Sequence, residues 1–343
     1  MALNRSRTRI AVTVTAVVAA ALAVGAGTAD AGTHLPWRGG RQPKPAVTAT
    51  RAPSVSPTTA TASPRATTSP RPSASRTRTS SPRPSASPST TPTPKPTSGT
   101  TAGSWTPPPA NGNFDYQIGA PYQPPAGVTV VSRDYTVSPA AQLYNICYVN
   151  AFQAQPGAES WWKSQHPELL LRNAAGELVV DEDWDELMLD FSTAAKRTAL
   201  TGIVGGWMDQ CAAKGYRAVE PDNLDSYTRS QGLLTQSQAI AYATSLSSYA
   251  HGKGLAVGQK NTADLSTANA RQAGFDFAVA EECADWDECD AYTRTYGDKV
   301  IVIEYSKAGF TKACNAYGSK LSIVWRDVDV TAPGSGSYVS KAC

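Results

Sequence analysis

Residues 255–281 read LAVGQKNTADLSTANARQAGFDFAVAE, which is a strand, a helix and a second strand in succession. Residues 255–261 and 275–281 are apolar runs of strand length, and residues 265–272 between them have helical spacing. Strands joined through a helix pair in parallel within one sheet. The stretch therefore predicts an α/β fold.

The same unit recurs on both sides of this stretch. Strand-length runs occupy residues 128–134, 143–150, 187–190, 218–223, 255–261, 275–281, 300–304 and 321–327. Helical spacing between them appears at 194–211, 237–251, 265–272, 287–296 and 310–317. Eight such units in about 200 residues predict a (β/α)8 TIM barrel. The alternative, an open doubly wound sheet, usually carries a Gly-rich phosphate loop after its first strand, and the sequence has none.

Nearly every predicted strand ends in a polar residue. Active sites of this barrel lie at the carboxyl ends of the strands, so these groups should converge on one mouth. They are Asp134, Asp190, Asp222, Lys260, Glu281, Glu304 and Asp327. A single aspartate after a strand could equally cap the next helix, but capping does not explain seven ionisable groups.

The residue types at the mouth select one chemistry. The sequence lacks a GxSxG elbow, an HExxH motif and a P-loop. Carboxylates with a lysine, amides and aromatics fit glycoside hydrolysis, in which one carboxylic acid protonates the leaving oxygen and a second carboxylate attacks or activates water. Aromatic rings can stack on sugars, and the candidates are Tyr148, Trp161, Trp162, Trp184, Tyr227, Trp286, Tyr305 and Trp325.

Several blocks resemble a known family. They are GYRAVEPDNLDSY (215–227), GQKN (258–261), FDFAVAEEC (275–283), DEC (287–289) and IEY (303–305). In this order, over about residues 115–330, they resemble glycoside hydrolase family 114, the endo-α-1,4-polygalactosaminidases. The resemblance implies a TIM barrel that cleaves α-1,4-linked galactosamine polymers without a cofactor. After the run 143–150 the chain departs from the family, reading YVNAFQAQ (148–155) where a Gly-containing turn and a glutamate are usual.

The resemblance places the catalytic carboxylates on Asp222 and Glu281, at the ends of the fourth and sixth predicted strands. We expect Asp222 to be the nucleophile and Glu281 the general acid/base. Lys260 should favour the ionised form of Asp222. The residues expected to bind substrate or tune the carboxylates are Asp134, Asp190, Asn223, Lys260, Asn261, Glu304, Tyr305 and Trp161.

Six cysteines follow an export-type leader, so disulfides are expected. A zinc site is the competing interpretation, but there is no CxxC pair and the domain has only His166 and His251, so no metal is expected. Six cysteines allow fifteen pairings. We expect Cys283 with Cys289, Cys147 with Cys211, and Cys314 with Cys343.

The amino-terminal third has a different composition. Residues 1–31 combine arginines, an apolar run and an Ala-Asp-Ala end, which predicts a signal peptide and no membrane span after its cleavage. Residues 32–110 are rich in Pro, Ser, Thr and Arg and predict a disordered linker, followed by a catalytic domain over 111–343. Residues 1–114 hold thirteen Lys or Arg against one acid, so with +3 overall the remainder carries −9.

These charges suggest the partners. The basic linker suits an anionic cell wall, and the acidic domain suits a cationic or neutral polysaccharide rather than nucleic acid. We expect a secreted, extracellular monomer. Two alternatives stay open, namely another α-glycosidase of the α-galactosidase type and a non-catalytic carbohydrate-binding barrel; the presence of both carboxylates disfavours the second.

Overall fold

The computed structural model describes residues 104–343. The expected signal peptide, and the expected linker up to residue 103, lie outside the described residues. Within residues 104–343, none of the helices has the length and apolar character needed to cross a bilayer.

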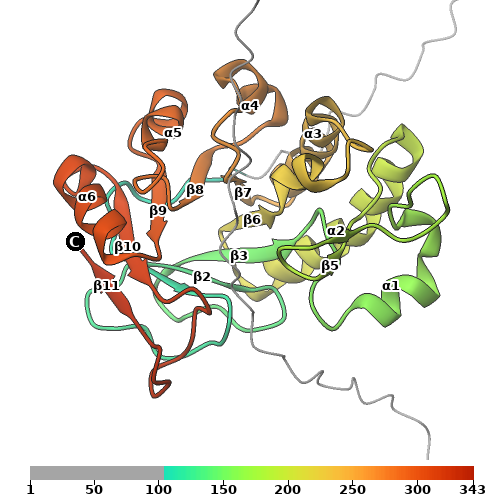
Figure 1. Cartoon of the computed structure of the whole chain (residues 1–343). Helices are drawn as coiled ribbons and strands as arrows, with labels where there is room; N and C mark the ends of the chain where they lie inside the picture. The colour runs from blue at the N-terminus through green and yellow to red at the C-terminus, as the bar shows by residue number, and fades with distance from the viewer. Residues whose placement is uncertain (1–103) are drawn as a thin grey trace, which may run out of the picture. The chain divides into compact units, whose positions relative to one another are not determined.

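Eight parallel strands of the described chain pair side by side in the order in which they occur along it (Figure 1). They are β1 (Phe114–Gln117), β2 (Val130–Asp134), β3 (Tyr144–Asn150), β6 (Ala218–Asp222), β7 (Ala256–Lys260), β8 (Phe277–Glu281), β9 (Val300–Glu304) and β10 (Ser322–Arg326). The larger helices that follow them are α2 (Ala194–Lys214), α3 (Gln236–Gly252), α4 (Thr267–Ala273), α5 (Cys289–Tyr296) and α6 (Lys307–Tyr317). The predicted TIM barrel is confirmed.

Side chains complete the barrel between its first and last parallel strands. Strands β1 and β10 contact each other without a shared ladder, and β11 (Ser340–Ala342) pairs antiparallel with β10. The fully buried Arg326 of β10 lies 3.5 Å from Asp115 of β1. It also donates to the hydroxyl of Tyr122 at 3.2 Å. The barrel is therefore nearly closed.

Two strand assignments made from the sequence were wrong. The first barrel strand, β1, was not predicted, and residues 187–190 are not a barrel strand. Instead β5 (Glu186–Leu187) pairs antiparallel with β4 (Val180–Asp181) in a separate two-stranded sheet. Isolated bridges then join Met188 to Gln153 and Leu189 to Leu170. The two errors cancel in the count, so Asp222 and Glu281 still end the fourth and sixth barrel strands.

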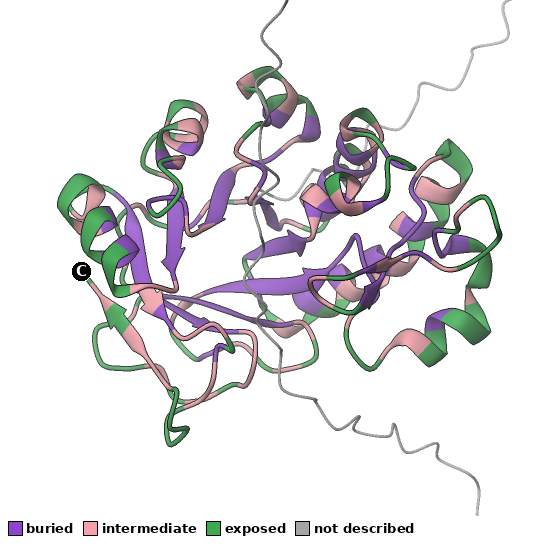
Figure 2. Cartoon of the chain, in the orientation of Figure 1, coloured by how far each residue is buried: buried purple, intermediate pink, exposed green. Residues whose placement is uncertain are grey.

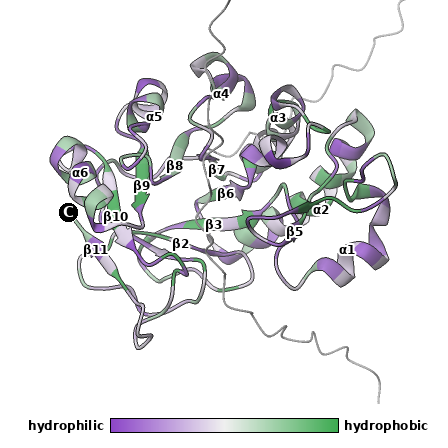
Figure 3. Cartoon of the chain, in the orientation of Figure 1, coloured by the Kyte–Doolittle hydropathy of each residue, from purple (hydrophilic) through white to green (hydrophobic). Residues whose placement is uncertain are grey.

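The strands are apolar on both faces because the barrel has an inside and an outside core (Figure 2 and Figure 3). In β9 the side chains of Ile301 and Ile303 fill the interior, whereas Val300 and Val302 pack outward beneath helices. Continuous apolar runs are typical of parallel strands that are buried on both faces. This is why strand-length apolar runs located seven of the eight strands.

Side-chain caps fix where the helices begin. Thr235 and Gln238 form a capping box at α3, and Ser266 and Ser306 cap α4 and α6. The long connection between β3 and β6 also holds α1 (Glu159–Gln165) and the short 3-10 helix η1 (Pro167–Leu169), and η2 (Leu224–Arg229) follows β6.

All three expected disulfides are present, namely Cys147–Cys211, Cys283–Cys289 and Cys314–Cys343. They agree with export to an oxidising compartment.

Residues 104–110, within the range expected to be linker, lie against the barrel. The indole of Trp105 stacks on His251, with ring centroids 3.8 Å apart, and donates to Asp276 at 2.9 Å.

Candidate active site

Three neighbouring barrel strands end in the same backbone arrangement. The residues that follow Asp222, Lys260 and Glu281 all adopt left-handed backbone conformations: Asn223 (φ 67°), Asn261 (φ 46°) and Glu282 (φ 55°). Asparagine tolerates this region, but glutamate rarely adopts it. Strained backbone of this kind concentrates at functional sites. Each turn ends its strand with the preceding polar side chain at the mouth.

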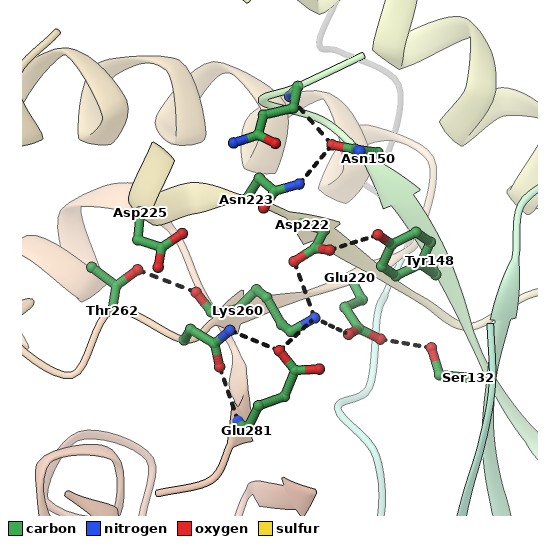
Figure 4. A network of polar contacts seen from close by, with 12 residues as sticks. Ser132, Tyr148, Asn150, Glu220, Asp222, Asn223, Asp225, Lys260, Thr262 and Glu281 are labelled. Carbon is green, nitrogen blue, oxygen red and sulfur yellow. Dashed lines mark hydrogen bonds and ion pairs between the residues drawn. The ribbon is translucent and has the colours of Figure 1, made fainter. Parts of the chain in front are cut away.

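The ammonium group of Lys260 lies at the centre of this mouth (Figure 4). Its Nζ is 3.0 Å from Asp222 Oδ1, 3.4 Å from Glu281 Oε2 and 3.3 Å from Glu220 Oε1. The side chain is only 2% exposed. Burial alone would lower the pKa of Lys260, but the three carboxylates outweigh it and raise the pKa well above its ordinary value. The site therefore contains a permanent buried cation.

Asp222 is held in its ionised form. Burial opposes the charge, but the Lys260 ammonium, a hydrogen bond from Tyr148 at 2.6 Å and the backbone N–H of Asn223 together lower the pKa of Asp222. Burial, together with the charge of Asp222, raises the pKa of Tyr148 far above its usual value. Tyr148 thus stays a hydrogen-bond donor. Asp222 has the protonation state that a nucleophile or a general base requires.

Glu281 is oriented by two neighbouring side chains. Tyr305 donates to Oε1 at 2.5 Å, and the amide of Asn261 donates to Oε2 at 2.9 Å. The amide oxygen of Asn261 also accepts the backbone N–H of Glu281 at 2.9 Å. Side chains that directly follow β7 and β9 therefore fix this carboxyl group of β8 beside Lys260.

Glu220 is the third carboxyl group in contact with the Lys260 ammonium. It lies two residues before Asp222 on β6, is fully buried, and accepts from Tyr116 at 2.9 Å and from Ser132 at 2.6 Å. Burial raises the pKa of Glu220, although Lys260 opposes the shift. Since it is sealed from solvent, Glu220 stabilises the network and cannot reach a substrate.

A further carboxyl group lies beside Asp222. Glu186 Oε2 accepts from Asn150 at 2.8 Å and from Asn223 at 3.3 Å, and the residue is 4% exposed. Burial raises the pKa of Glu186 to about 8, the Asn150 hydrogen bond opposes this, and the charge of Asp222 adds to it. At neutral pH the group is mostly protonated, and a cation placed against it would favour its ionised form.

Of the eight residues expected to bind substrate or tune the carboxylates, four contact the site described above, namely Asn223, Lys260, Asn261 and Tyr305. Asp134 instead accepts from Thr136 and Gln155.

Three other expected residues lie outside the network around Lys260. Asp190 pairs with Lys196 of α2. Trp161 lies on α1, 41% exposed, with its ring against Trp162, His166 and Trp207. Glu304 ends β9 but contacts the loop after β8.

Sequence reasoning missed Tyr116 and Glu186. Tyr116 had a signal, because residues 114–117 alternate apolar and polar side chains as a strand with one wet face does. Glu186 had none, since it reaches the mouth through the two-stranded sheet β4–β5 rather than from a barrel strand.

One cluster of the described residues has metal-ligand atoms in reach of each other, namely Cys283, Cys289 and Glu304. The two thiols are joined as a disulfide, so they offer no thiolate ligands.

Comparisons with known proteins identify the family of the chain. The family model of glycoside-hydrolase family GH114 matches residues 94–343. Ega3 of Aspergillus fumigatus, solved in complex with galactosamine, is 22% identical with a TM-score of 0.57, and the match covers 71% of this chain and 99% of that chain. The glycoside hydrolase domain of PelA from Pseudomonas aeruginosa is 14% identical with a TM-score of 0.45, covering 67% and 97%. None of the curated proteins matches the sequence. Because the family match spans most of the chain, this protein belongs to glycoside-hydrolase family GH114 and is a glycoside hydrolase.

Proposed function

We propose that this protein is a secreted, endo-acting hydrolase of α-1,4-linked, galactosamine-containing polysaccharide, with Asp222 as nucleophile and Glu281 as general acid/base. The observation that carries the proposal is the shared contact of both carboxyl groups with the buried ammonium of Lys260. Exposed carboxylates that only serve solubility have no such arrangement.

The spacing of the pair supports a retaining mechanism. Lys260 Nζ lies 3.0 Å from Asp222 Oδ1 and 3.4 Å from Glu281 Oε2. Both oxygens contact the same ammonium group, so the two carboxyl groups can adopt the separation of about 5 to 5.5 Å that retaining enzymes show. At that separation Asp222 attacks the anomeric carbon directly.

The two groups then act in sequence. Asp222 forms a bond to the anomeric carbon while Glu281 donates its proton to the departing glycosidic oxygen. Forming the ester removes the charge of Asp222 from beside Glu281, which favours the ionised Glu281 as the base for the second step. A water then gives its proton to Glu281, attacks the anomeric carbon and releases Asp222.

The charge of the domain supports a cationic substrate. Residues 115–343 carry −9, and an acidic surface attracts a polymer with free amino groups. Glu186 fits the same substrate, because an ammonium group of the substrate near Asp222 would favour the ionised form of Glu186.

The test is incubation with partly deacetylated galactosaminogalactan and, separately, with a neutral α-galactan, followed by sizing of the products. We expect oligomers from the first polymer only, and less cleavage at high ionic strength. The Asp222→Asn variant is the control for contaminating activity. Cleavage of the neutral polymer alone would favour the α-galactosidase type, and binding without cleavage would favour a non-catalytic barrel.

A further inference from the structure

The loop that follows Glu281 is fastened at several points. The Cys283–Cys289 disulfide closes it, and the backbone N–H of Glu288 donates to Cys283 O at 2.7 Å. At its start the N–H of Glu282 donates to Ile303 O on β9 at 2.7 Å. We call residues 282–288 the acid-base loop, because they continue the chain directly from Glu281.

Glu304 contacts this loop from behind. Its Oε1 accepts the N–H of Ala284 at 2.8 Å. Successive residues of a strand point to opposite sides, and the next residue, Tyr305, donates to Glu281 at the mouth. Glu304 therefore lies on the side away from the substrate and is fully buried.

The second oxygen of Glu304 lies close to Gly309. Oε2 is buried and has no hydrogen-bond partner within the part of the chain that the structure describes. Its neighbour across Gly309 is another acceptor: a methyl group built on Gly309 would lie 2.3 Å from Glu304 Oε2 and 2.7 Å from Asp285 Oδ1. The other oxygen of Asp285 accepts from Ser306, which caps α6. Both oxygens thus lie close to the same point, and two carboxyl groups that share a site favour a proton on one of them.

We propose that Glu304 is a positioning residue whose neutral carboxyl group donates its proton to Asp285, and that this contact fastens the acid-base loop against α6. The positioning of Glu281 rests on the function proposed above, but the Glu304–Asp285 contact does not.

The surroundings of Glu304 favour its neutral form. Burial raises its pKa to about 7, the backbone N–H groups of Ala284 and Asp285 oppose this, and the charges of Asp285 and Glu282 add to it. Those two acids of the loop are the charged groups that face Glu304. The disulfide joins Cys283 of the loop to the first residue of α5, and α6 contributes Gly309 and its N-cap Ser306.

The contact therefore weakens as pH rises. Since the pKa in the folded protein lies above the ordinary value of 4.5, its contribution to stability is complete below about pH 4.5 and is lost as pH rises through about 7.

The experiment compares the wild type with Glu304→Gln, in which the side-chain amide donates to Asp285 at every pH. Urea unfolding of both proteins at pH 5 and pH 8 should show that the folding constant of the wild type falls relative to the variant by on the order of a hundredfold. From pH 5 to pH 8 the kcat of the variant, divided by the kcat of the wild type, should also rise, because only the wild type loses the contact. Dividing the two values removes the pH dependence due to Glu281, which both proteins share.

Two further variants complete the test. Gly309→Ala places a methyl group against both carboxyl groups, which must move to make room, and should reduce the pH dependence of stability. Asp287→Asn, an exposed loop residue paired with Lys312, is the matched control and should keep the wild-type dependence. The proposal is overturned if Glu304→Gln has the same pH dependence of unfolding as the wild type, or if it loses kcat equally at both pH values, as loss of a substrate-binding carboxylate would. A wild type inactive on every polymer, with the expected unfolding result, would refute the proposed function alone.

Discussion

At the scale of single residues, one buried cation organises the site. Lys260 contacts Asp222, Glu281 and Glu220, and its hydrogen bond to Tyr116 at 3.2 Å ties it to the first barrel strand. Removing it would leave the carboxyl groups facing one another in a buried setting, a change that typically costs about 3 to 5 kcal/mol.

We predict that Lys260→Met moves the acidic limb of the pH profile of kcat/KM to higher pH, by at least about one pH unit. The ammonium is the strongest influence that lowers the pKa of Asp222, so its loss raises that pKa, and ionised Asp222 then requires a higher pH. Tyr148→Phe removes one hydrogen bond and should give a smaller shift in the same direction. An unchanged limb in Lys260→Met, measured on protein shown to be folded by circular dichroism, would mean that Lys260 does not tune Asp222.

Glu186 should determine the preference for amino sugars. Glu186→Gln can keep the hydrogen bond from Asn150 but cannot ionise against an ammonium group. We expect kcat/KM on a fully deacetylated polymer to fall about tenfold, and by clearly more than on an N-acetylated polymer. Glu177→Gln, an exposed change in the same connection, is the control. Equal losses on the two polymers would show a structural role instead.

The sequence predicted the carboxylates and the lysine of the site, because polar residues at the ends of parallel strands must meet at one mouth. It did not predict which of them touch. Asp134 also ends a strand, yet its side chain bonds to Thr136 and Gln155 rather than to Lys260. The choice depends on rotamers and turns, such as the left-handed Asn223, that a strand pattern does not contain.

At the scale of elements, the run 187–190 shows the limit of periodicity. It is as apolar as a barrel strand, but only three residues separate it from α2. Isolated antiparallel bridges pair its backbone with Gln153 and Leu170 instead of with a barrel strand, and its side chains are buried there. Periodicity reports that a run is buried and does not report its partner.

The packing of α2 on α3 offers a matched pair of glycines. A methyl group on Gly205 would lie 2.8 Å from the ring of Tyr249, whereas one on Gly206 meets nothing within 4 Å. Gly206→Ala should therefore stabilise the protein by up to about 1 kcal/mol through helix propensity. Gly205→Ala should destabilise the protein, because the ring of Tyr249 must move away. This movement distorts the 2.9 Å hydrogen bond that Tyr249 donates to Asp209. Urea unfolding measures both, and an equal effect of the two substitutions would contradict this packing.

At the scale of the whole molecule, the folded unit begins before residue 111. Trp105 stacks on His251 and donates to Asp276, which also accepts the N–H of Val257 at 2.8 Å. The composition of residues 32–110 could not reveal this, because one tryptophan hardly alters a Pro- and Thr-rich average.

We predict that a protein starting at Ser104 unfolds at the same urea concentration as the full chain and keeps its activity on soluble substrate. A protein starting at Pro107, which lacks Trp105, should lose about 2 to 3 kcal/mol of stability through the missing ring contact and hydrogen bond. Equal stability of the two truncated proteins would show that Trp105 contributes nothing to the fold.

Azide rescue tests the central claim, the division of roles between Asp222 and Glu281, most directly. With an α-galactosaminide whose leaving group needs no protonation, azide should react with Asp222→Ala by attacking opposite the leaving group, and the product should be the β-azide. With Glu281→Ala, the ester to Asp222 still forms and azide opens it, so the product should be the α-azide. Nuclear magnetic resonance of the anomeric proton distinguishes the two products. The α-azide from Asp222→Ala together with the β-azide from Glu281→Ala would exchange the roles, and the absence of an azide product from both variants would contradict the retaining mechanism.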